Sequence, residues 1–354
     1  MEQIKINRLP GQTWNKLKMN FTQADKKDFE GRLPENALEN GTESARTAEV
    51  YHKETEFRTG LGEEFSQLLA ECGFENTSCL KTEEYGKKTY RIYLHREGKD
   101  QCRVYGMRAE QGSELTVYMY VGNDSEVGTG RAGIQTLIEA GSGAKVKLVQ
   151  IIDAGAETEV LNDIGAELSE NAQLVVDQIF LGGKRIVSGT FAALKGRKAD
   201  FQNNIAYYMR EGQDLDINVI SSQTAKKTRS EIDVKGVLDK GARKLLRATI
   251  DFISGCSGSV GKENEDVLLL DENVENKTIP LILCSEEDVE GQHGASIGKI
   301  DEKAVFYLKS RGLPEDRIYD IMAAARIETI LGRIGDDETT EKVRASYEGR
   351  KLNG

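Results

Sequence analysis

Proline is scarce in this sequence and unevenly distributed. The 354 residues include four prolines against 36 glycines, and none stands between Pro34 and Pro280. Proline cannot donate a backbone hydrogen bond and disrupts interior strands, so a long span without it is typical of a backbone whose amides lie in ladders. We therefore expect the middle of the chain to be rich in β-structure.

Cysteine and histidine are also few, which limits the metal chemistry that we expect of the chain. The five cysteines are an odd number with no Cys-x-x-Cys pair, and the three histidines are scattered. These counts disfavour a disulfide framework and a self-contained zinc site. We expect free thiols in a reducing compartment. The cysteines are Cys72, Cys79, Cys102, Cys256 and Cys284, and the histidines are His52, His95 and His293.

Long apolar runs and excess positive charge are absent as well. The net charge is −11, which disfavours nucleic acid or an anionic membrane as the main partner. No apolar run approaches the roughly 20 residues that span a bilayer. The N-terminal stretch MEQIKINRLPGQTW has no apolar core of the kind found in secretion signals. We expect a soluble, cytoplasmic protein.

The common catalytic motifs are missing too. The sequence has no GxxxxGK[ST], GxSxG, HExxH or EF-hand pattern. Its most acidic stretch, GKENEDVLLLDENVEN (261–276), has two interpretations. Runs of acids usually form a solvated face, and the alternative is an acid–base pair.

What the middle of the chain does contain is alternation with period two. ELTVYMYV (114–121) and DLDINVI (214–220) alternate apolar and polar residues, as strands do. Glycine- or asparagine-containing turns recur roughly every 12 to 16 residues, which suits a sandwich, a barrel or a stacked solenoid. The lack of Asn-Gly hairpin turns favours the solenoid. Further expected strands are 146–152, 172–180, 185–194, 198–209 and 243–253.

The N-terminal region differs from the middle. Residues 61–72 place four apolar side chains on one face of an expected helix, and Gly73 can end it. These side chains are Phe65, Leu68, Leu69 and Cys72. The preceding polar stretch, 36–60, is typical of a loop or linker.

Helical patterns return at the C-terminal end. Asp301 can cap a helix that runs to Arg311, with Ala304, Val305 and Leu308 on one face and Gly312 as its stop. Pro314 can open a second helix, which we expect Gly332 to end. Its apolar stripe is Ile318, Ile321, Met322, Ala325 and Ile330. The charged tail from Gly335 is expected to fray.

One histidine stands in an unusual stretch. His293 lies in EGQHGASIGKI, which we expect to be a small glycine-rich loop before the first of these helices. It is either a surface or capping residue of a turn, or a metal ligand or proton carrier, since imidazole titrates near neutral pH. Gly294, Ala295 and Ser296 would let another chain or a ligand approach the backbone.

Three segments resemble one known family. HGASIGKIDEKAVFYLKSRGL (293–313) closely resembles the C-terminal signature of the SufB/SufD family, the β-helical components of the SUF iron–sulfur cluster assembly machinery. EDVLLLDENVENKTIPLI (265–282) is similar to the family's penultimate β-helix coils, and INRLPGQTWNKLKMN (6–20) to the N-terminal segment of SufD-type chains.

The resemblance implies an architecture and a role. It implies an all-β core, a right-handed parallel β-helix over 96–300, between an N-terminal helical and loop region (1–95) and a C-terminal helical domain (301–354). It implies a non-catalytic scaffold that pairs through its β-helix with a SufB-type subunit, or with itself as a dimer. SufC-type ABC ATPases would bind the C-terminal helices near Phe306, Tyr307 and Arg311, and a cysteine desulfurase would supply sulfur.

Departures from the family pattern favour the SufD type. Val274 stands where SufB-type chains have a sulfur-accepting cysteine, and Gly294 where they have a glutamate. Gly291 replaces a cysteine that is frequent in SufD-type chains. The resemblance makes His293 the candidate ligand or transfer residue for a transient iron–sulfur cluster at the subunit interface, with a structural turn as the alternative.

Several points stay open at the level of sequence. We expect Cys256 and Cys284 to be buried, inert thiols, because they match no motif position, with supply of thiolates as the alternative. Reduced flavin is associated with related assemblies, although no nucleotide-binding loop is visible. The other function classes are a secreted-type carbohydrate-active β-helix enzyme and a purely structural β-solenoid.

Overall fold

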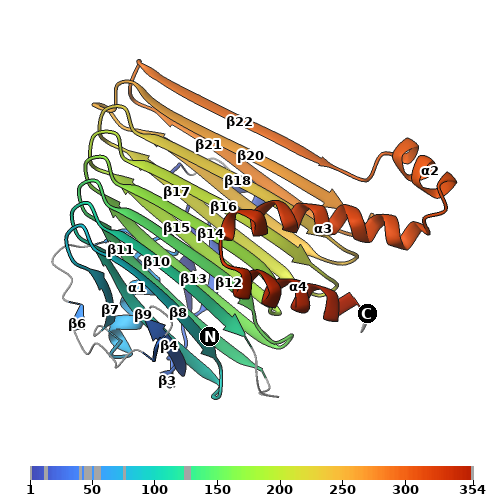
Figure 1. The fold of residues 1–354 in the computed structure, drawn as a ribbon, viewed down its shortest axis with the longest axis horizontal. Helices are drawn as coiled ribbons and strands as arrows, with labels where there is room; N and C mark the ends of the chain where they lie inside the picture. The colour runs from blue at the N-terminus through green and yellow to red at the C-terminus, as the bar shows by residue number, and fades with distance from the viewer. Residues whose placement is uncertain are drawn as a thin grey trace.

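The computed structural model describes residues 2–11, 15–39, 42–43, 50–51, 57–74, 77–122 and 129–351. Most of them form a flattened solenoid of two facing sheets (Figure 1). The chain alternates between the sheets, so each rung of the solenoid has one strand from each. All pairs of neighbouring strands from β7 and β8 onward are parallel. The predicted β-solenoid is therefore confirmed.

One sheet consists mainly of even-numbered strands and is here called the even sheet. These strands are β8 (Lys87–His95), β10 (Glu114–Gly122), β12 (Lys145–Asp153), β14 (Gln173–Gly182), β16 (Asp200–Met209), β18 (Arg229–Leu238), β20 (Ser259–Leu269) and β22 (Val289–Gly298). At its first edge, β4 (Glu35–Glu39) pairs antiparallel with β8, and β5 (Thr42–Glu43) with β4.

The odd sheet faces it. Its strands are β7 (Thr77–Thr82), β9 (Asp100–Ala109), β11 (Gly130–Ala140), β13 (Thr158–Leu168), β15 (Arg185–Leu194), β17 (Asp214–Gln223), β19 (Arg243–Phe252) and β21 (Glu275–Cys284). Two short strands, β6 (Val50–Tyr51) and β3 (Gly31–Arg32), pair with β7 and β9. The expected boundary at residues 95 and 96 falls between β8 and β9.

The main core fills the lumen between the sheets. Because parallel strands stack in register, residues of equal position form columns, such as Val117, Leu148 and Val176, all fully buried. Burial of these columns explains the apolar residues at alternate positions of the strands, as in β10. Pro280 fits this arrangement because it lies in β21, the last strand of its sheet, where a missing N–H is tolerated.

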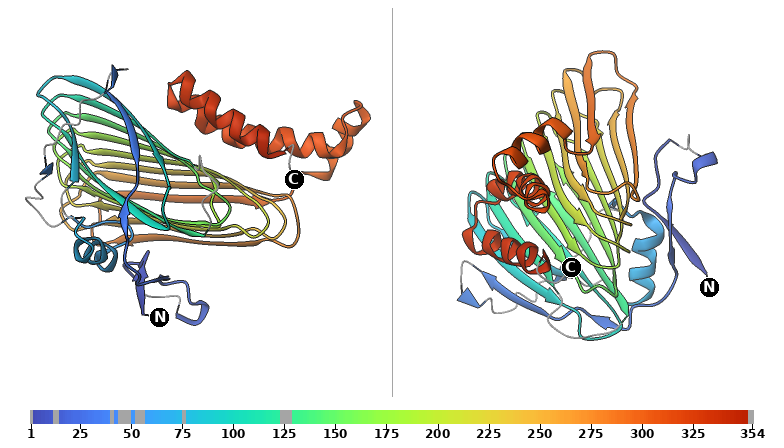
Figure 2. Two further views of the ribbon diagram at one scale, coloured as in Figure 1. Left: turned by 90° about the horizontal axis from the view of Figure 1, so that it is seen from below. Right: turned by 90° about the vertical axis from the view of Figure 1, so that its right-hand side faces the viewer.

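The N-terminal region covers the outer face of the odd sheet (Figure 2). It contains β1 (Gln3–Ile6), η1 (Asn15–Leu17), β2 (Thr22–Asp25) and α1 (Glu63–Glu71). The predicted helix is confirmed, with Phe65, Leu68 and Leu69 buried against the sheet and Gly73 at a positive φ of 77° beyond its end. Most of the expected 36–60 loop lies outside the described residues.

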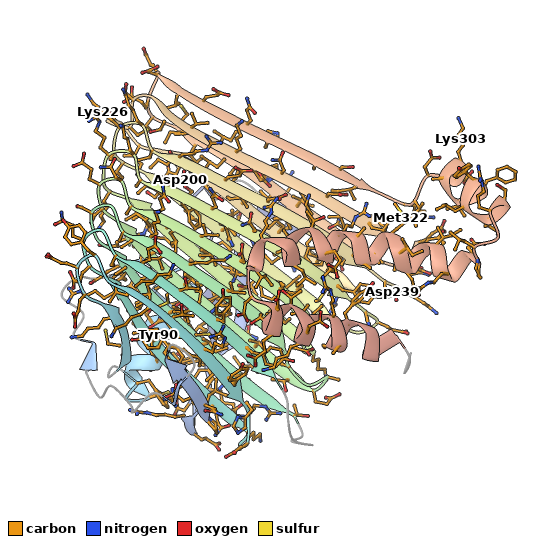
Figure 3. The ribbon with its side chains drawn as sticks, viewed as in Figure 1. Tyr90, Asp200, Lys226, Asp239, Lys303 and Met322 are labelled. Carbon is orange, nitrogen blue, oxygen red and sulfur yellow. The ribbon has the colours of Figure 1, made fainter. Side chains whose placement is uncertain are left out.

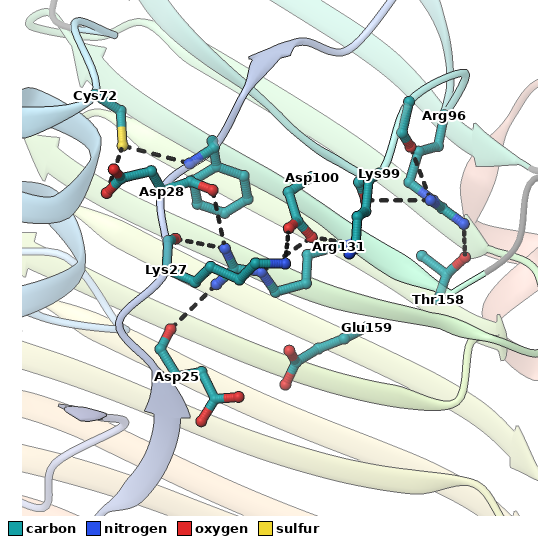
Figure 4. A network of polar contacts seen from close by, with 12 residues as sticks. Asp25, Lys27, Asp28, Cys72, Arg96, Lys99, Asp100, Arg131, Thr158 and Glu159 are labelled. Atoms are coloured by element: carbon teal, nitrogen blue, oxygen red, sulfur yellow. Dashed lines mark hydrogen bonds and ion pairs between the residues drawn. The ribbon is translucent and has the colours of Figure 1, made fainter. Parts of the chain in front are cut away.

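Polar anchors on the sheet hold this region in place (Figure 4). The Arg131 guanidinium donates to the carbonyl oxygen of Asp25 at 3.1 Å and to Asp100 at 3.3 Å. Asp163, fully buried, accepts from the Leu61 backbone N–H and from Gln135, both at 2.8 Å. Burial raises the pKa of Asp163 to about 6, although these hydrogen bonds favour its charged form.

Three helices follow the last strand: α2 (Glu302–Ser310), α3 (Glu315–Ile334) and α4 (Asp337–Lys351). α2 begins and ends as predicted, with Asp301 accepting from the Lys303 N–H at its start. The prediction that Gly332 ends the second helix is wrong, because α3 continues to Ile334 and Gly335 takes the left-handed conformation. The expected frayed tail forms α4 instead.

α3 and α4 lie along the outer face of the even sheet (Figures 1 and 2). Ile318 and Ile330 of the predicted stripe are buried there, but Ile321 is 44% exposed, and Ile327 and Ile334 complete the apolar contact instead. The stripe is displaced because the helix packs against a broad sheet. The Lys147 ammonium donates to the Ile334 carbonyl at 2.8 Å, at the negative end of the α3 dipole.

No helix among the described residues is long and apolar enough to cross a membrane.

Candidate functional site

The solenoid ends in an uncovered rung. β21 and β22 are the last strands of their sheets, and within the described part of the chain no strand pairs with their outer edges. Residues 290–297 of β22 are all exposed. An unpaired strand edge presents a row of backbone donors and acceptors that can pair with another chain. At the other end, β4 covers part of the corresponding edge.

His293 belongs to this edge. The expected glycine-rich loop is wrong, because residues 289–298 form strand β22. The hydrogen bonds to β20 impose an extended conformation on the glycines, which no sequence periodicity indicated. His293 lies in register with Glu263 of β20, on the lumen side of the sheet. It is exposed because no further rung lies above it.

A charged cluster lies in the lumen beneath the last rung. Lys244 of β19 forms a buried ion pair with Glu265 of β20, and its ammonium donates to the Thr278 hydroxyl at 2.9 Å. Thr278 donates in turn to the second Glu265 oxygen at 2.8 Å. The three side chains thus satisfy one another, which a buried charge requires.

Glu263 is the neighbour of this triad. It is 4% exposed, and burial, together with the charge of Glu265, raises its pKa to about 8 despite the opposing effect of Lys244. Burial likewise lowers the pKa of Lys244. The interpretation of 261–276 as a solvated face is therefore wrong for Glu263 and Glu265, which point into the lumen.

The positions that distinguish family members can also be placed. Val274 directly precedes β21 and packs against the lumen core. A side chain at Gly291 would put its β-carbon 3.1 Å from Ile282 Cγ2, so a cysteine there would need small shifts of its neighbours. A β-carbon at Gly294 would meet Asn264 Oδ1 at 3.5 Å, an ordinary contact.

The two late cysteines differ in exposure. Cys256 is fully buried, and burial raises its pKa. Cys284 is exposed, so the expectation that it is buried is wrong; its thiol donates to the Glu286 carbonyl at 3.0 Å. Across the described ranges, no three or more histidine, cysteine and acidic side chains are grouped to hold a metal ion.

α2 projects from the solenoid beyond β22 (Figure 1, and Figure 3, where Lys303 marks it). Ala304, Val305 and Leu308 are half-buried in the helical cluster, as predicted. Phe306 and Tyr307 are 75% and 54% exposed on the other side. The Arg311 guanidinium lies 5.1 Å from the centre of the Tyr307 ring. Tyr307 and Arg311 are therefore in contact at the surface, and Phe306 is exposed on the same helix.

The fold and site together define a parallel β-solenoid with an open pairing edge and a projecting C-terminal helix. The family model for the SufBD core domain of the SUF iron–sulfur cluster assembly system matches residues 94–326. This chain belongs to that family, and the resemblance found in the sequence is confirmed at this level.

Individual proteins named as iron–sulfur cluster assembly proteins are also similar to this chain. A SufBD family protein of Mycobacterium leprae is 33% identical over 120 residues, which are 34% of this chain and 14% of that protein. One from Staphylococcus epidermidis is 26% identical over 148 residues, 42% of this chain and 32% of the relative. The Bacillus subtilis iron–sulfur cluster assembly protein SufB is 25% identical over 159 residues, which are 45% of this chain and 34% of that protein. The matched segments thus cover at most 34% of these relatives.

Proposed function

We propose that this chain is a SufD-type, non-catalytic scaffold subunit of a SUF iron–sulfur cluster assembly complex. The observation that carries the proposal is the open last rung, with His293 on its exposed strand and the projecting helix α2 directly after it. Val274 and Gly294 support the SufD type, since the residues of SufB-type chains are missing at both positions.

The partner at the open rung is a SufB-type subunit or a second copy of this chain. A strand laid along β22 would satisfy backbone groups that now face solvent and would cover Ile297, which is 44% exposed. The same contact would bury the side chain of His293 between the two proteins. Main-chain pairing also tolerates sequence differences, so it suits both kinds of partner.

The ATPase partner binds α2 and its neighbours. Exposed aromatic and arginine side chains are frequent anchors of protein interfaces, and Phe306, Tyr307 and Arg311 offer all of these on one helix. Because α2 projects, a domain bound there meets little of the solenoid. Hydrolysis by the ATPase could then shift the helical region relative to the open edge.

The iron–sulfur cluster is the cargo of this assembly. His293 is the ligand or transfer residue that this chain contributes, through a neutral imidazole nitrogen. Few thiols lie near it at motif positions, so the partner supplies the thiolates, and sulfur reaches the complex from a cysteine desulfurase. The buried ion pair of Lys244 and Glu265 near the site is in the lumen rather than on an outer face, which supports a scaffold over a carbohydrate-active enzyme.

A hollow beside the N-terminal region does not suit reduced flavin. This hollow of about 770 Å³ lies between residues 18–23 and the odd sheet and is lined largely by charged side chains. Its arginines pair with acids, as Arg185 does with Glu159 at 2.8 Å, and such a lining does not suit an isoalloxazine ring. We derive no step through flavin.

Co-expression tests the proposal. The chain is produced with the SufC-type and SufB-type subunits of its own organism, and the mass of the purified assembly is measured by light scattering. We expect one complex that contains all three proteins. A well-folded chain that elutes without the ATPase would refute the scaffold role.

A further inference from the structure

One edge of the solenoid is built from short turns that lead from each odd strand to the next even strand. Each of these turns from β7 to β20 has a residue in the left-handed conformation at the same place in the rung, and the turn from β19 to β20 has a second residue with positive φ, Gly255. The backbone N–H of the residue at the shared place donates to a carbonyl of the next turn, as Lys198 does to Lys226 and Lys227 to Ser257, both at 3.0 Å. The residues at the shared place are Tyr85, Gly112, Gly143, Asn171, Lys198, Lys227 and Gly258.

Two adjacent turns of this edge contain several cations, and these two turns are here called the basic turns. Residues 195–199 read KGRKA and residues 224–228 read TAKKT. The five cations are exposed, and Figure 3 shows Lys226 at the rim of the molecule. They are Lys195, Arg197, Lys198, Lys226 and Lys227. The protein as a whole has a net charge of −11.

The charge of the basic turns is largely unneutralised. Lys195 pairs with Glu167 at 2.6 Å. Among the described residues, the other four cations form no ion pair at the 4 Å limit. The turn before them contains Glu170, and the last turn of the edge contains Glu286, Glu287 and Asp288. Along the edge, the positive patch is thus bounded on one side by an acidic turn and on the other by the uncharged turn 253–258, with the acidic turn 285–288 beyond it.

The backbone conformation of two lysines in the basic turns is also unusual. A left-handed φ is unfavourable for lysine and favourable for glycine or asparagine, which occupy four of the seven equivalent positions. Lysine stands there twice, at φ 59° and 60°, in the two adjacent turns. Residues that break a local rule without a structural gain are expected at functional sites. The backbone conformation alone therefore does not explain why lysine occupies these two positions.

We infer that the basic turns bind a short acidic segment of a partner protein. Neighbouring rungs are about 4.8 Å apart, so two turns offer a narrow patch that a few acidic side chains can cover. The acidic turns along the same edge and the negative net charge would repel a long polyanion such as nucleic acid. The patch is separate from the open rung and from α2, so this inference does not rest on the proposed scaffold role.

A fluorescein-labelled peptide of about four residues, alternating glutamate and serine, would extend over roughly 13 Å, which is close to the span of the two turns. Its binding to the full chain is measured by fluorescence anisotropy, with a glutamine–serine peptide and a single-stranded oligonucleotide as comparisons. We expect binding of the acidic peptide that weakens with salt. Arg197→Glu/Lys226→Glu should weaken it at least about tenfold. The control Lys184→Glu/Lys240→Glu, at the opposite edge, makes the same charge change and should alter it less than about twofold.

Lys198→Gly/Lys227→Gly separates function from structure. A glycine at a left-handed position removes strain, so this variant should melt at the same or a higher temperature while it loses peptide binding. Lysine acetylation monitored by mass spectrometry should show Lys198, Lys226 and Lys227 protected by the peptide and Lys240 unprotected. The inference is overturned if the control reduces binding equally, if the acidic peptide does not bind, or if the oligonucleotide binds as tightly.

Discussion

His293 lies opposite Glu263 across the ladder that joins β22 to β20. Both residues occupy the lumen side of the sheet, yet Glu263 is 4% exposed and His293 faces solvent. The difference arises because one rung covers Glu263 and none covers His293. The last strand therefore displays the inner face of the solenoid, which a partner that continues the sheet would bury again.

His293→Ala should leave the fold intact and impair cluster assembly. The side chain is exposed and makes no hydrogen bond with the other described residues, so its removal should change the free energy of unfolding by less than about 0.5 kcal/mol. Cluster formation is followed by visible absorption during anaerobic assembly with the partner subunits. Gln292→Ala, one residue away on the same exposed strand, is the control. Normal cluster assembly by the His293→Ala variant would show that His293 is neither a ligand nor a transfer residue for the cluster.

Lys244→Met should destabilise the solenoid strongly. The substitution leaves the Glu265 carboxylate buried without its ion-pair partner, which typically costs about 3–5 kcal/mol. Adding Glu265→Met should restore most of this loss, because no buried charge then remains unpaired there. Urea denaturation of the single and double variants gives both values. Additive losses in the double variant would contradict the coupling.

Asp163 should make stability depend on pH. Its pKa is raised by burial from 3.8 to about 6 in the folded protein, so the folded state binds the proton more tightly than the unfolded chain. Its contribution is therefore fully present below pH 3.8 and is lost as the pH rises to about 6, on the order of 3 kcal/mol in total.

The difference in unfolding free energy between wild type and Asp163→Asn isolates this effect, because the other carboxylates are common to both. We expect the difference, wild type minus variant, to fall between pH 4 and pH 6 and to be constant above about pH 7. Glu290→Gln, an acid-to-amide substitution at an exposed position of β22, is the control. A flat difference for Asp163→Asn would show that its pKa is not raised.

Phe306→Ala/Tyr307→Ala should weaken binding of the SufC-type ATPase without lowering the melting temperature. Both rings are more exposed than buried, so little packing is lost, whereas interface aromatics typically contribute about 2 kcal/mol or more. Leu308→Ala, which removes a half-buried contact of α2, should lower the melting temperature instead. If the aromatic variant melts early and binds normally, the two rings are structural.

Strong periodicity made several central strands predictable, whereas β11, β13 and β18 were not among the expected segments. β10 and β16 match the expected segments closely because one face packs into the lumen at every rung. β20 and β22 were missed as strands by alternation alone. Their polar and glycine-rich residues adopt strand geometry because β18 and β20 offer a ready edge, which is a tertiary effect.

The site was predictable only in part. The family signature identified His293, Phe306, Tyr307 and Arg311, but not that His293 lies on a strand edge, since a glycine-rich stretch is typical of loops. Glu265 and Lys244 lie far apart in sequence, and only the stacking of rungs brings them together. The charged tail was expected to fray because its helix has little apolar content, whereas Val343 and Tyr347 dock it on the even sheet.

The central claim is that the open edge of β22 is where this chain pairs with its partner. Amide hydrogen exchange tests it most directly, because it reports on the backbone of residues 289–298 in the chain alone and after a SufB-type subunit is added. The account predicts fast exchange of the outward-facing amides alone and strong protection in the complex. Protection that appears elsewhere while β22 exchanges as before would contradict it.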